Sequence, residues 1–201
     1  MIPMVKDDHQ KMVTMITDAI KSVYASVYFR NSKAYMAATS NVIDEEKMGI
    51  ILQEVCGTQY GNRFYPTISG VGRSINFYPI EPEKTTDGTA NIAYGLGKYL
   101  MDGGVGLRFS PRYPKKILQL SSPDLVLRDT QKMFFSLDMN PKSFMPSVDD
   151  GINLFKLPIK EAEEDRSFQF AASTFDLENH MIRDGLQNNV KRVITFSNIL
   201  N

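Results

Sequence analysis

The sequence predicts an α+β fold in which a mostly antiparallel sheet is packed by one long N-terminal helix. Two patterns lead to this expectation. Apolar residues recur every three to four positions near the N-terminus, whereas the rest of the chain alternates short β-type segments with Gly and Pro turns. At 201 residues, 42% of them hydrophobic, the chain is long enough to bury a core.

The predicted helix runs from Lys11 to about Ala38. Its apolar positions have the spacing of a single helix face, which we expect to be buried against the sheet. These positions are Val13, Ile16, Ile20, Val23, Tyr24, Val27 and Tyr28.

Strands are predicted along the first half of the chain after this helix. Met48 to Val55 is nearly continuously apolar, which is typical of a strand buried on both faces. Phe64 to Val71 and Ser74 to Tyr78 alternate large and small residues and predict paired strands. Further strands are expected at Thr89–Tyr94 and Leu107–Phe109.

Beyond Pro114 the strand pattern continues with fewer turn signals. The predicted strands are Met133–Leu137, Ile152–Ile159, Phe168–Ala172 and Arg192–Phe196, with a helical turn at Lys160–Asp165. The proline-bearing stretch Asn140–Val148 is the best candidate for a boundary between parts of the chain.

Composition excludes several classes of protein. Lys+Arg and Asp+Glu are both 23, so no overall charge favours nucleic acid or an anionic membrane. No apolar run approaches the ~20 residues of a membrane helix, and the N-terminus lacks the features of a signal peptide, so we expect a cytoplasmic protein. One cysteine and two histidines without metal-ligand spacing provide neither a disulfide nor a zinc site.

The turn Gly95-Leu-Gly97-Lys98 has some features of a phosphate-binding P-loop. Such a loop needs an earlier glycine and a Ser or Thr after the lysine, but Ile92 and Tyr99 stand at these two positions. The sequence therefore excludes a true P-loop and leaves two interpretations, a sharp turn after a strand or a phosphate contact of another kind.

The order of four short motifs is more informative. A helix containing Ala19–Tyr28 is followed by Met48–Val55, then by Ser69-Gly70-Val71 and by Gly95-Leu-Gly97. From Asp18 to Pro114 this order resembles the nucleotide-binding region of the phosphoenolpyruvate synthase and pyruvate phosphate dikinase family, which has an ATP-grasp fold. The resemblance implies a fragment of the large lobe of an ATP-grasp domain.

The resemblance implies ATP and Mg²⁺ as cofactors. Gln53, Glu54 and Val55 match the hinge whose backbone recognises adenine, because a strand edge offers both a donor and an acceptor. Asp87 lies near the acidic position that would bind magnesium, and Glu81 and Glu83 are nearby alternatives.

Cationic residues are the candidates for binding the phosphates. Arg73, Arg108 and Arg112 can present guanidinium forks. Lys98 follows the glycine turn where the family carries an acid. This departure either removes a metal contact or supplies a phosphate contact. The basic, aromatic segment Arg108–Lys116 also fits single-stranded nucleic acid, which zero net charge disfavours.

The resemblance is partial. Residues 1–116 match a nucleotide-binding region without its upstream lobe, and residues 117–201 are an associated β-rich region that either completes the lobe or forms a satellite unit. We expect an ATP-binding fragment of a phosphotransferase whose parent reaction passes phosphate through a histidine on another domain to pyruvate. The alternative is a non-catalytic interaction or regulatory module on a degenerate scaffold.

Overall fold

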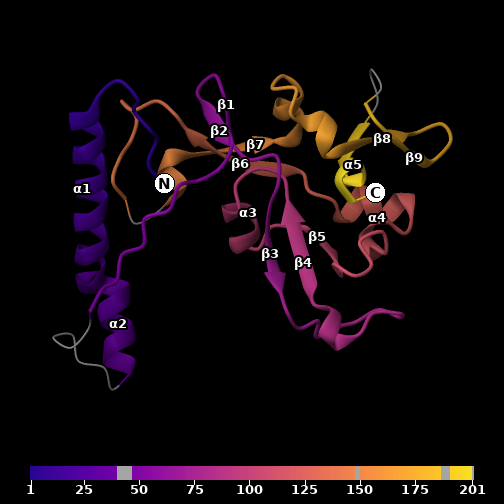
Figure 1. The fold of residues 1–201 in the computed structure, drawn as a ribbon, viewed down its shortest axis with the longest axis horizontal. Coiled ribbons are helices and arrows are strands. Elements are labelled where there is room, and N and C mark those ends of the chain that lie inside the picture. The colour runs from indigo at the N-terminus through magenta and orange to yellow at the C-terminus, as the bar shows by residue number, and fades with distance from the viewer. Residues whose placement is uncertain (40–46, 148–149, 187–190, 201) are drawn as a thin grey trace. The chain divides into compact units, whose positions relative to one another are not determined.

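The computed structural model describes residues 1–39, 47–147, 150–186 and 191–200. Contacts divide the chain into one unit formed by Met1–Cys56 and Leu137–Phe155 and another formed by Gly57–Ser136 and Lys156–Asn201 (Figure 1). The proposed boundary stretch 140–148 falls within the first unit, and its last residue, Val148, lies outside the described residues. The predicted division at residue 116 stays a prediction.

The first unit begins with the predicted helix, which is confirmed but interrupted. It comprises α1 (His9–Ala25), the short 3₁₀ turn η1 (Ser26–Tyr28) and α2 (Arg30–Ala38). The Asp8 carboxylate caps α1 by accepting a hydrogen bond from the Lys11 amide at 2.9 Å. Phe29 separates the turn from α2 because its backbone is extended, with φ −71° and ψ 157°.

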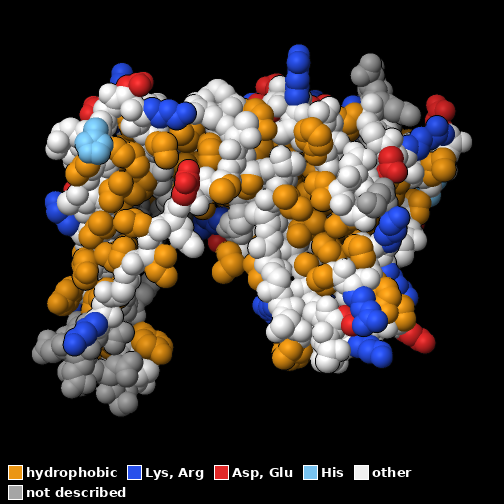
Figure 2. All heavy atoms as spheres, viewed as in Figure 1, with side chains coloured by type: hydrophobic (Ala, Val, Ile, Leu, Met, Phe, Trp, Pro, Cys, Tyr) orange, Lys and Arg blue, Asp and Glu red, His pale blue; other side chains and the backbone are white. Residues whose placement is uncertain are grey.

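Most of the apolar stripe on these helices is exposed, so the expectation of a buried face is wrong for those residues. Met15 and Val27 are buried, whereas Tyr24 and Tyr28 are 54% and 63% exposed. Figure 2 shows hydrophobic side chains at the surface along α1. Periodicity identifies which side of a helix is apolar, but it does not specify what covers that side.

The predicted strand at Met48–Val55 is also wrong. Residues 47–57 have no regular secondary structure, and Ile51 and Leu52 are 84% and 68% exposed. An apolar run identifies a buried strand only when another strand supplies its hydrogen bonds, and periodicity does not show whether such a partner exists.

The second unit contains the sheet that positions the candidate site. Strands β3 (Ser69–Arg73), β4 (Thr89–Ala93) and β5 (Leu107–Phe109) are antiparallel and lie in that order (Figure 1). The expected strands at Thr89–Tyr94 and Leu107–Phe109 are confirmed. Phe64–Val71 is divided between β2 and β3 around Pro66, and Ser74–Tyr78 forms no strand.

The described residues form two further sheets, in which the pairs β1–β2, β10–β8 and β8–β9 are antiparallel. One has the order β1-β2-β6-β7 and the other has the order β10-β8-β9. Their strands are β1 (Thr58–Tyr60), β2 (Arg63–Tyr65), β6 (Met133–Asp138), β7 (Leu154–Pro158), β8 (Ala172–Asp176), β9 (Met181–Asp184) and β10 (Lys191–Ile194). The expected strand at Phe168–Ala172 is wrong, because Phe168–Phe170 form a 3₁₀ turn and β8 begins only at Ala172.

Short helical elements connect these strands. The helix α4 was missed by the sequence interpretation, although Ser122 caps it and Pro123 occupies its first turn. The short elements are η3 (Thr85–Asp87), α3 (Lys98–Met101), η4 (Leu118–Leu120), α4 (Pro123–Asp129), η5 (Asp150–Asn153), η6 (Ile159–Glu163), η7 (Phe168–Phe170) and α5 (Ser197–Leu200).

Aromatic residues form the centre of the second unit. Tyr65, Tyr94, Phe134 and Phe168 are fully buried. The Tyr65 ring packs edge-to-face on Tyr94 and Phe134, with centroids 5.6 and 4.9 Å apart. Gly95 turns the chain beside this cluster with φ +83°, and a side chain there would lie 2.9 Å from the Phe135 carbonyl oxygen.

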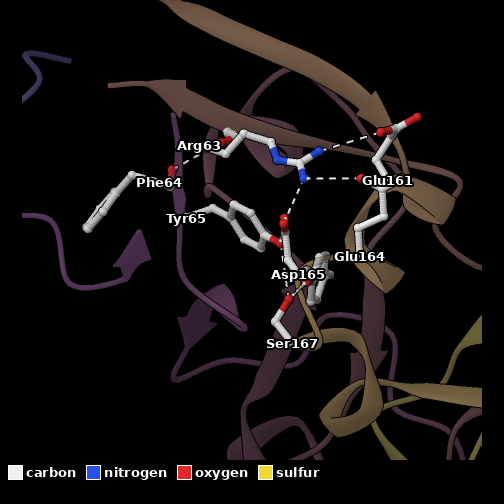
Figure 3. A network of polar contacts seen from close by, with 9 residues as sticks. Arg63, Phe64, Tyr65, Glu161, Glu164, Asp165 and Ser167 are labelled. Carbon is white, nitrogen blue, oxygen red and sulfur yellow. Dashed lines mark hydrogen bonds and ion pairs between the residues drawn. The ribbon is translucent and has the colours of Figure 1, made fainter. Parts of the chain in front are cut away.

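The two buried tyrosines belong to a polar network that includes Arg63 (Figure 3). Asp165 accepts hydrogen bonds from Arg63 Nη2 at 2.7 Å and from the Tyr65 hydroxyl at 2.6 Å. Ser167 lies within hydrogen-bond distance of the hydroxyls of Tyr65 and Tyr94. The network therefore joins β2 and the residue that follows β4 to the segment after η6.

Burial raises the pKa of both tyrosines, because an ionised phenolate would lose its hydration in this core. The pKa of Tyr94 rises to about 12, and that of Tyr65 is raised further by its hydrogen bond to Asp165. Both hydroxyls therefore stay protonated at neutral pH.

Candidate functional site

A hollow of about 370 Å³ lies in the second unit, beside β4 and β5. This volume falls within the ~300–1,000 Å³ range of typical small-molecule sites. It is lined by Ile80, Glu83, Asn91, Gly103, Gly104, Val105, Gly106, Arg108, Phe109, Lys116, Leu118 and Gln119. Apolar walls with a few charged and amide groups are suited to a ligand that has both apolar and anionic parts.

Arg108 is the best-positioned cation of the hollow. It lies on β5 opposite Asn91 of β4, and its side chain is half-buried. Its Nη2 atom donates to Asn76 Oδ1 at 2.6 Å and to the Tyr78 carbonyl oxygen at 3.2 Å. These contacts hold one edge of the guanidinium, which leaves the group in a defined orientation at the wall of the hollow.

Gln119 holds the backbone of β5 and of the segment before it. Its Oε1 atom accepts a hydrogen bond from the Arg108 amide at 2.8 Å, and its Nε2 atom donates to the Gly106 carbonyl oxygen at 2.9 Å. Because both ends of the amide are used, Gln119 ties β5 and the preceding glycine segment to η4. Its contribution is to shape the hollow.

The segment Gly103–Gly106 forms another wall through close backbone packing. A side chain at Gly104 would lie 2.5 Å from Tyr99, and one at Gly106 would lie 2.3 Å from Asn91 Oδ1. The Gly103 and Gly104 amides donate to carbonyl oxygens of Leu100 and Tyr99. These two amides are therefore engaged within the chain, and the positive charge at the hollow comes from side chains.

The charged residues of the lining are Arg108, Lys116 and Glu83. Lys116 is exposed and donates to the Glu81 carbonyl oxygen. Glu83 Oε2 accepts hydrogen bonds from Asn76 Nδ2 at 2.9 Å and from the Ile80 amide at 3.1 Å. Two cations and one carboxylate leave an excess of positive charge at the hollow, which favours an anionic ligand.

Asn91 contributes an unusual polar atom beneath the glycine segment. Its Oδ1 atom is buried and accepts no hydrogen bond from the part of the chain that the structure describes. A buried acceptor without a donor is costly. Close packing of Gly106 on this atom explains why a larger residue at position 106 would disrupt the wall.

The other phosphate-binding candidates, Arg73, Lys98 and Arg112, are not in the lining. Arg73 ends β3 opposite Thr89 and is exposed. Lys98 begins α3, and its Nζ atom lies 3.2 Å from Asp102 Oδ1. The roles of these three residues in binding phosphate stay predictions.

The adenine-hinge candidates Gln53, Glu54 and Val55 lie in the first unit. They are exposed and belong to the irregular segment that replaces the predicted strand. A hinge strand with a free edge is therefore not formed by these residues, although their role in recognising adenine stays a prediction.

The magnesium candidate Asp87 already has two hydrogen-bond donors. Its Oδ2 atom accepts from the Lys84 amide at 2.7 Å, and its Oδ1 atom accepts from Arg112 Nη1 at 3.0 Å. The Lys84 amide, followed by Arg112, holds the pKa of this carboxyl below its usual value.

Each Asp87 oxygen keeps a second lone pair beside its hydrogen bond, and the role of this carboxylate as a magnesium ligand stays a prediction. No group of three or more His, Cys, Asp or Glu side chains with metal-binding geometry occurs among the described residues.

Sequence interpretation identified Arg108 but missed Asn76, Asn91 and Gln119. Nothing in the sequence distinguishes these amides from ordinary turn or strand residues, since their importance comes from contacts with residues far along the chain. Gln119 bonds Asp129 and Gly106, and Asn76 bonds a residue 32 positions away.

A family model described as "Pyruvate phosphate dikinase, AMP/ATP-binding domain" matches residues 9–130 of the chain. This range contains every residue that lines the hollow. The comparisons with curated proteins and with solved structures gave no match. None of the helices that the structure describes is both long and apolar enough to cross a membrane.

Proposed function

Because the chain belongs to the family of the pyruvate phosphate dikinase AMP/ATP-binding domain, we propose that it binds ATP and that the hollow beside β4 and β5 receives the phosphates. The observation that carries this proposal is the position of Arg108, a defined guanidinium in a hollow of ligand size within the matched range. Lys116 adds a second cation at the exposed side.

The chemistry of the proposed site consists of binding and orientation. A guanidinium can donate two parallel hydrogen bonds to phosphate oxygens, whereas an ammonium acts as a mobile point charge. Arg108 would therefore orient the phosphate chain, and Lys116 would offset part of its charge. Apolar contacts from Val105, Phe109 and Leu118 would exclude water from one side of the ligand.

The parent reaction that we propose is transfer of phosphate from ATP through a histidine on another domain to pyruvate. In phosphoryl transfer the protein contributes mainly positioning and electrostatic stabilisation. Other domains of a larger phosphotransferase would be the partners of this chain, in a cytoplasmic protein.

Magnesium remains part of the proposal. When bound with ATP, the ion would offset charge on the phosphates. Asp87 stays the candidate protein ligand of the ion, and we derive no step through the ion. Titration of ATP in the presence and absence of magnesium chloride would show whether the ion contributes to affinity.

We expect Arg108→Ala to weaken ATP binding by about tenfold to a hundredfold, because a hydrogen bond to a charged group is worth about 1.5–3 kcal/mol. Isothermal titration calorimetry of the whole chain with ATP measures this change. The matched control is Arg112→Ala, since Arg112 lies on the same segment, is 62% exposed and pairs with Asp87 outside the hollow.

The control variant should bind ATP as the wild-type chain does. Equal affinities of the wild-type and Arg108→Ala chains would contradict the placement of phosphate in the hollow. Absence of ATP binding by the wild-type chain would contradict the proposed function itself.

A second candidate function is a non-catalytic regulatory module. The observations that favour it are the ion pair between Lys98 and Asp102, at the position where the family carries an acid, and the engaged Asp87 carboxylate. This candidate predicts nucleotide binding without turnover. ATP consumption by the purified chain would exclude it.

A further inference from the structure

We infer that Asn76 is a positioning residue that orients the Arg108 guanidinium for a phosphate group, an inference that rests on the proposed function. Asn76 follows β3 at the start of the long turn that leads to η3 and does not line the hollow. Only 1% of its surface is exposed, so it acts on a ligand through the residue that it holds.

Asn76 is connected at both ends of its amide. Its Oδ1 atom accepts from Arg108 Nη2 at 2.6 Å and from the Tyr78 amide at 3.1 Å. Its Nδ2 atom donates to Glu83 Oε2 at 2.9 Å. Its backbone amide donates to the Thr85 carbonyl oxygen at 2.8 Å, which anchors the residue in the turn.

An amide is the side chain that suits this position. The acceptor must face the Arg108 cation, whereas the donor must face the Glu83 carboxylate. An aspartate would place a second carboxylate against Glu83, and an alanine would leave Arg108 without its buried acceptor. Asn76 thus connects the Arg108 guanidinium and the Glu83 carboxylate through opposite ends of its side-chain amide.

The consequence for binding follows from the freedom of the arginine side chain. An unrestrained arginine loses rotamer freedom when it binds a phosphate, and this loss lowers affinity. Asn76 and the Tyr78 carbonyl oxygen hold one edge of the guanidinium before a ligand arrives. The remaining donors of the fork are then presented in one orientation, which is the basis of preorganised phosphate recognition.

The test is a double-mutant cycle with Asn76→Ala, Arg108→Ala and the combined variant, measured by calorimetric titration of the whole chain with ATP. We expect Asn76→Ala to weaken binding about tenfold in the wild-type background and to have less than about a twofold effect when Arg108 is already alanine. A residue that only stabilised the turn would weaken binding in both backgrounds.

Because Asn76 is buried, thermal unfolding of each variant is measured as well, and Asn76→Ser serves if the alanine variant does not fold. Serine retains a small donor and acceptor, so its effect should depend on Arg108 in the same way. Equal losses in both backgrounds, or wild-type affinity for Asn76→Ala, would overturn the inference alone. Absence of ATP binding by the wild-type chain would overturn the proposed function together with it.

Discussion

Replacing Asp165 with alanine should lower the free energy of unfolding of the second unit by about 3 kcal/mol. The carboxylate is 7% exposed and joins two groups that have little access to water, the Arg63 guanidinium and the fully buried Tyr65 hydroxyl. Removal of the carboxylate leaves the largely buried Arg63 guanidinium and the buried Tyr65 hydroxyl without their shortest hydrogen bonds. Glu161, 3.5 Å from Arg63, retains part of the pairing.

Urea denaturation followed by tyrosine fluorescence and circular dichroism measures the Asp165 effect, and tyrosine is the suitable probe because the chain has no tryptophan. Glu164→Ala is the matched control. Glu164 belongs to the same cluster, but it is 74% exposed and lies 3.8 Å from Arg63, so its loss should cost less than about 0.5 kcal/mol. Indistinguishable midpoints for Asp165→Ala and Glu164→Ala would show that the buried network contributes no more than a surface ion pair.

The second large effect is expected in alkaline solution. The pKa of Tyr94 is raised to about 12, whereas an unfolded tyrosine ionises near ~10. A group whose pKa is raised on folding contributes stability that is fully present below its unfolded pKa and is lost as the pH rises through its folded pKa. The free energy of unfolding should therefore fall by about 3 kcal/mol between pH ~10 and ~12 from Tyr94 alone, and Tyr65 acts in the same direction.

Denaturation at a series of pH values from neutral to about 12, with tyrosinate absorbance recorded in parallel, measures this alkaline loss. Tyr94→Phe removes one titrating group. The free energy of unfolding of this variant should therefore decline less steeply in alkaline solution than that of the wild-type chain, even if it starts from a lower value at neutral pH. Tyr78→Phe is the control, since Tyr78 is 80% exposed and should leave the profile unchanged. A Tyr94→Phe profile parallel to that of the wild-type chain would contradict the burial argument.

Local patterns predicted several elements correctly because their signals lie within the segment itself. The spacing of Lys11–Ala38 predicted a helix, and strand-type residues between turn signals predicted β4, β5, β6, β7 and β10. The helical turn expected at Lys160–Asp165 is present as η6. Such elements are recognisable because side-chain spacing and turn chemistry are properties of neighbouring residues.

Burial was predicted less well because it depends on distant partners. Met48–Val55 has the composition of a central strand, yet Ile51 and Leu52 are exposed, and the apolar stripe of α1 is largely uncovered. Three phenylalanines of the second half of the chain differ in the same way, because Phe134 and Phe168 are fully buried whereas Phe170 is 53% exposed. Hydrophobicity gives the tendency to be buried, and topology decides whether it is realised.

By itself the sequence determined the α+β class, the family resemblance and the cationic residue Arg108 as a candidate for binding phosphate. Only the tertiary structure decided that Arg108 is held by Asn76, that Asp87 is engaged by Arg112, and that Tyr65 and Asp165 share one buried network. The reason is physical: a motif records residue type and local spacing, whereas a pKa or the orientation of a donor is set by groups brought together from positions far apart in the chain.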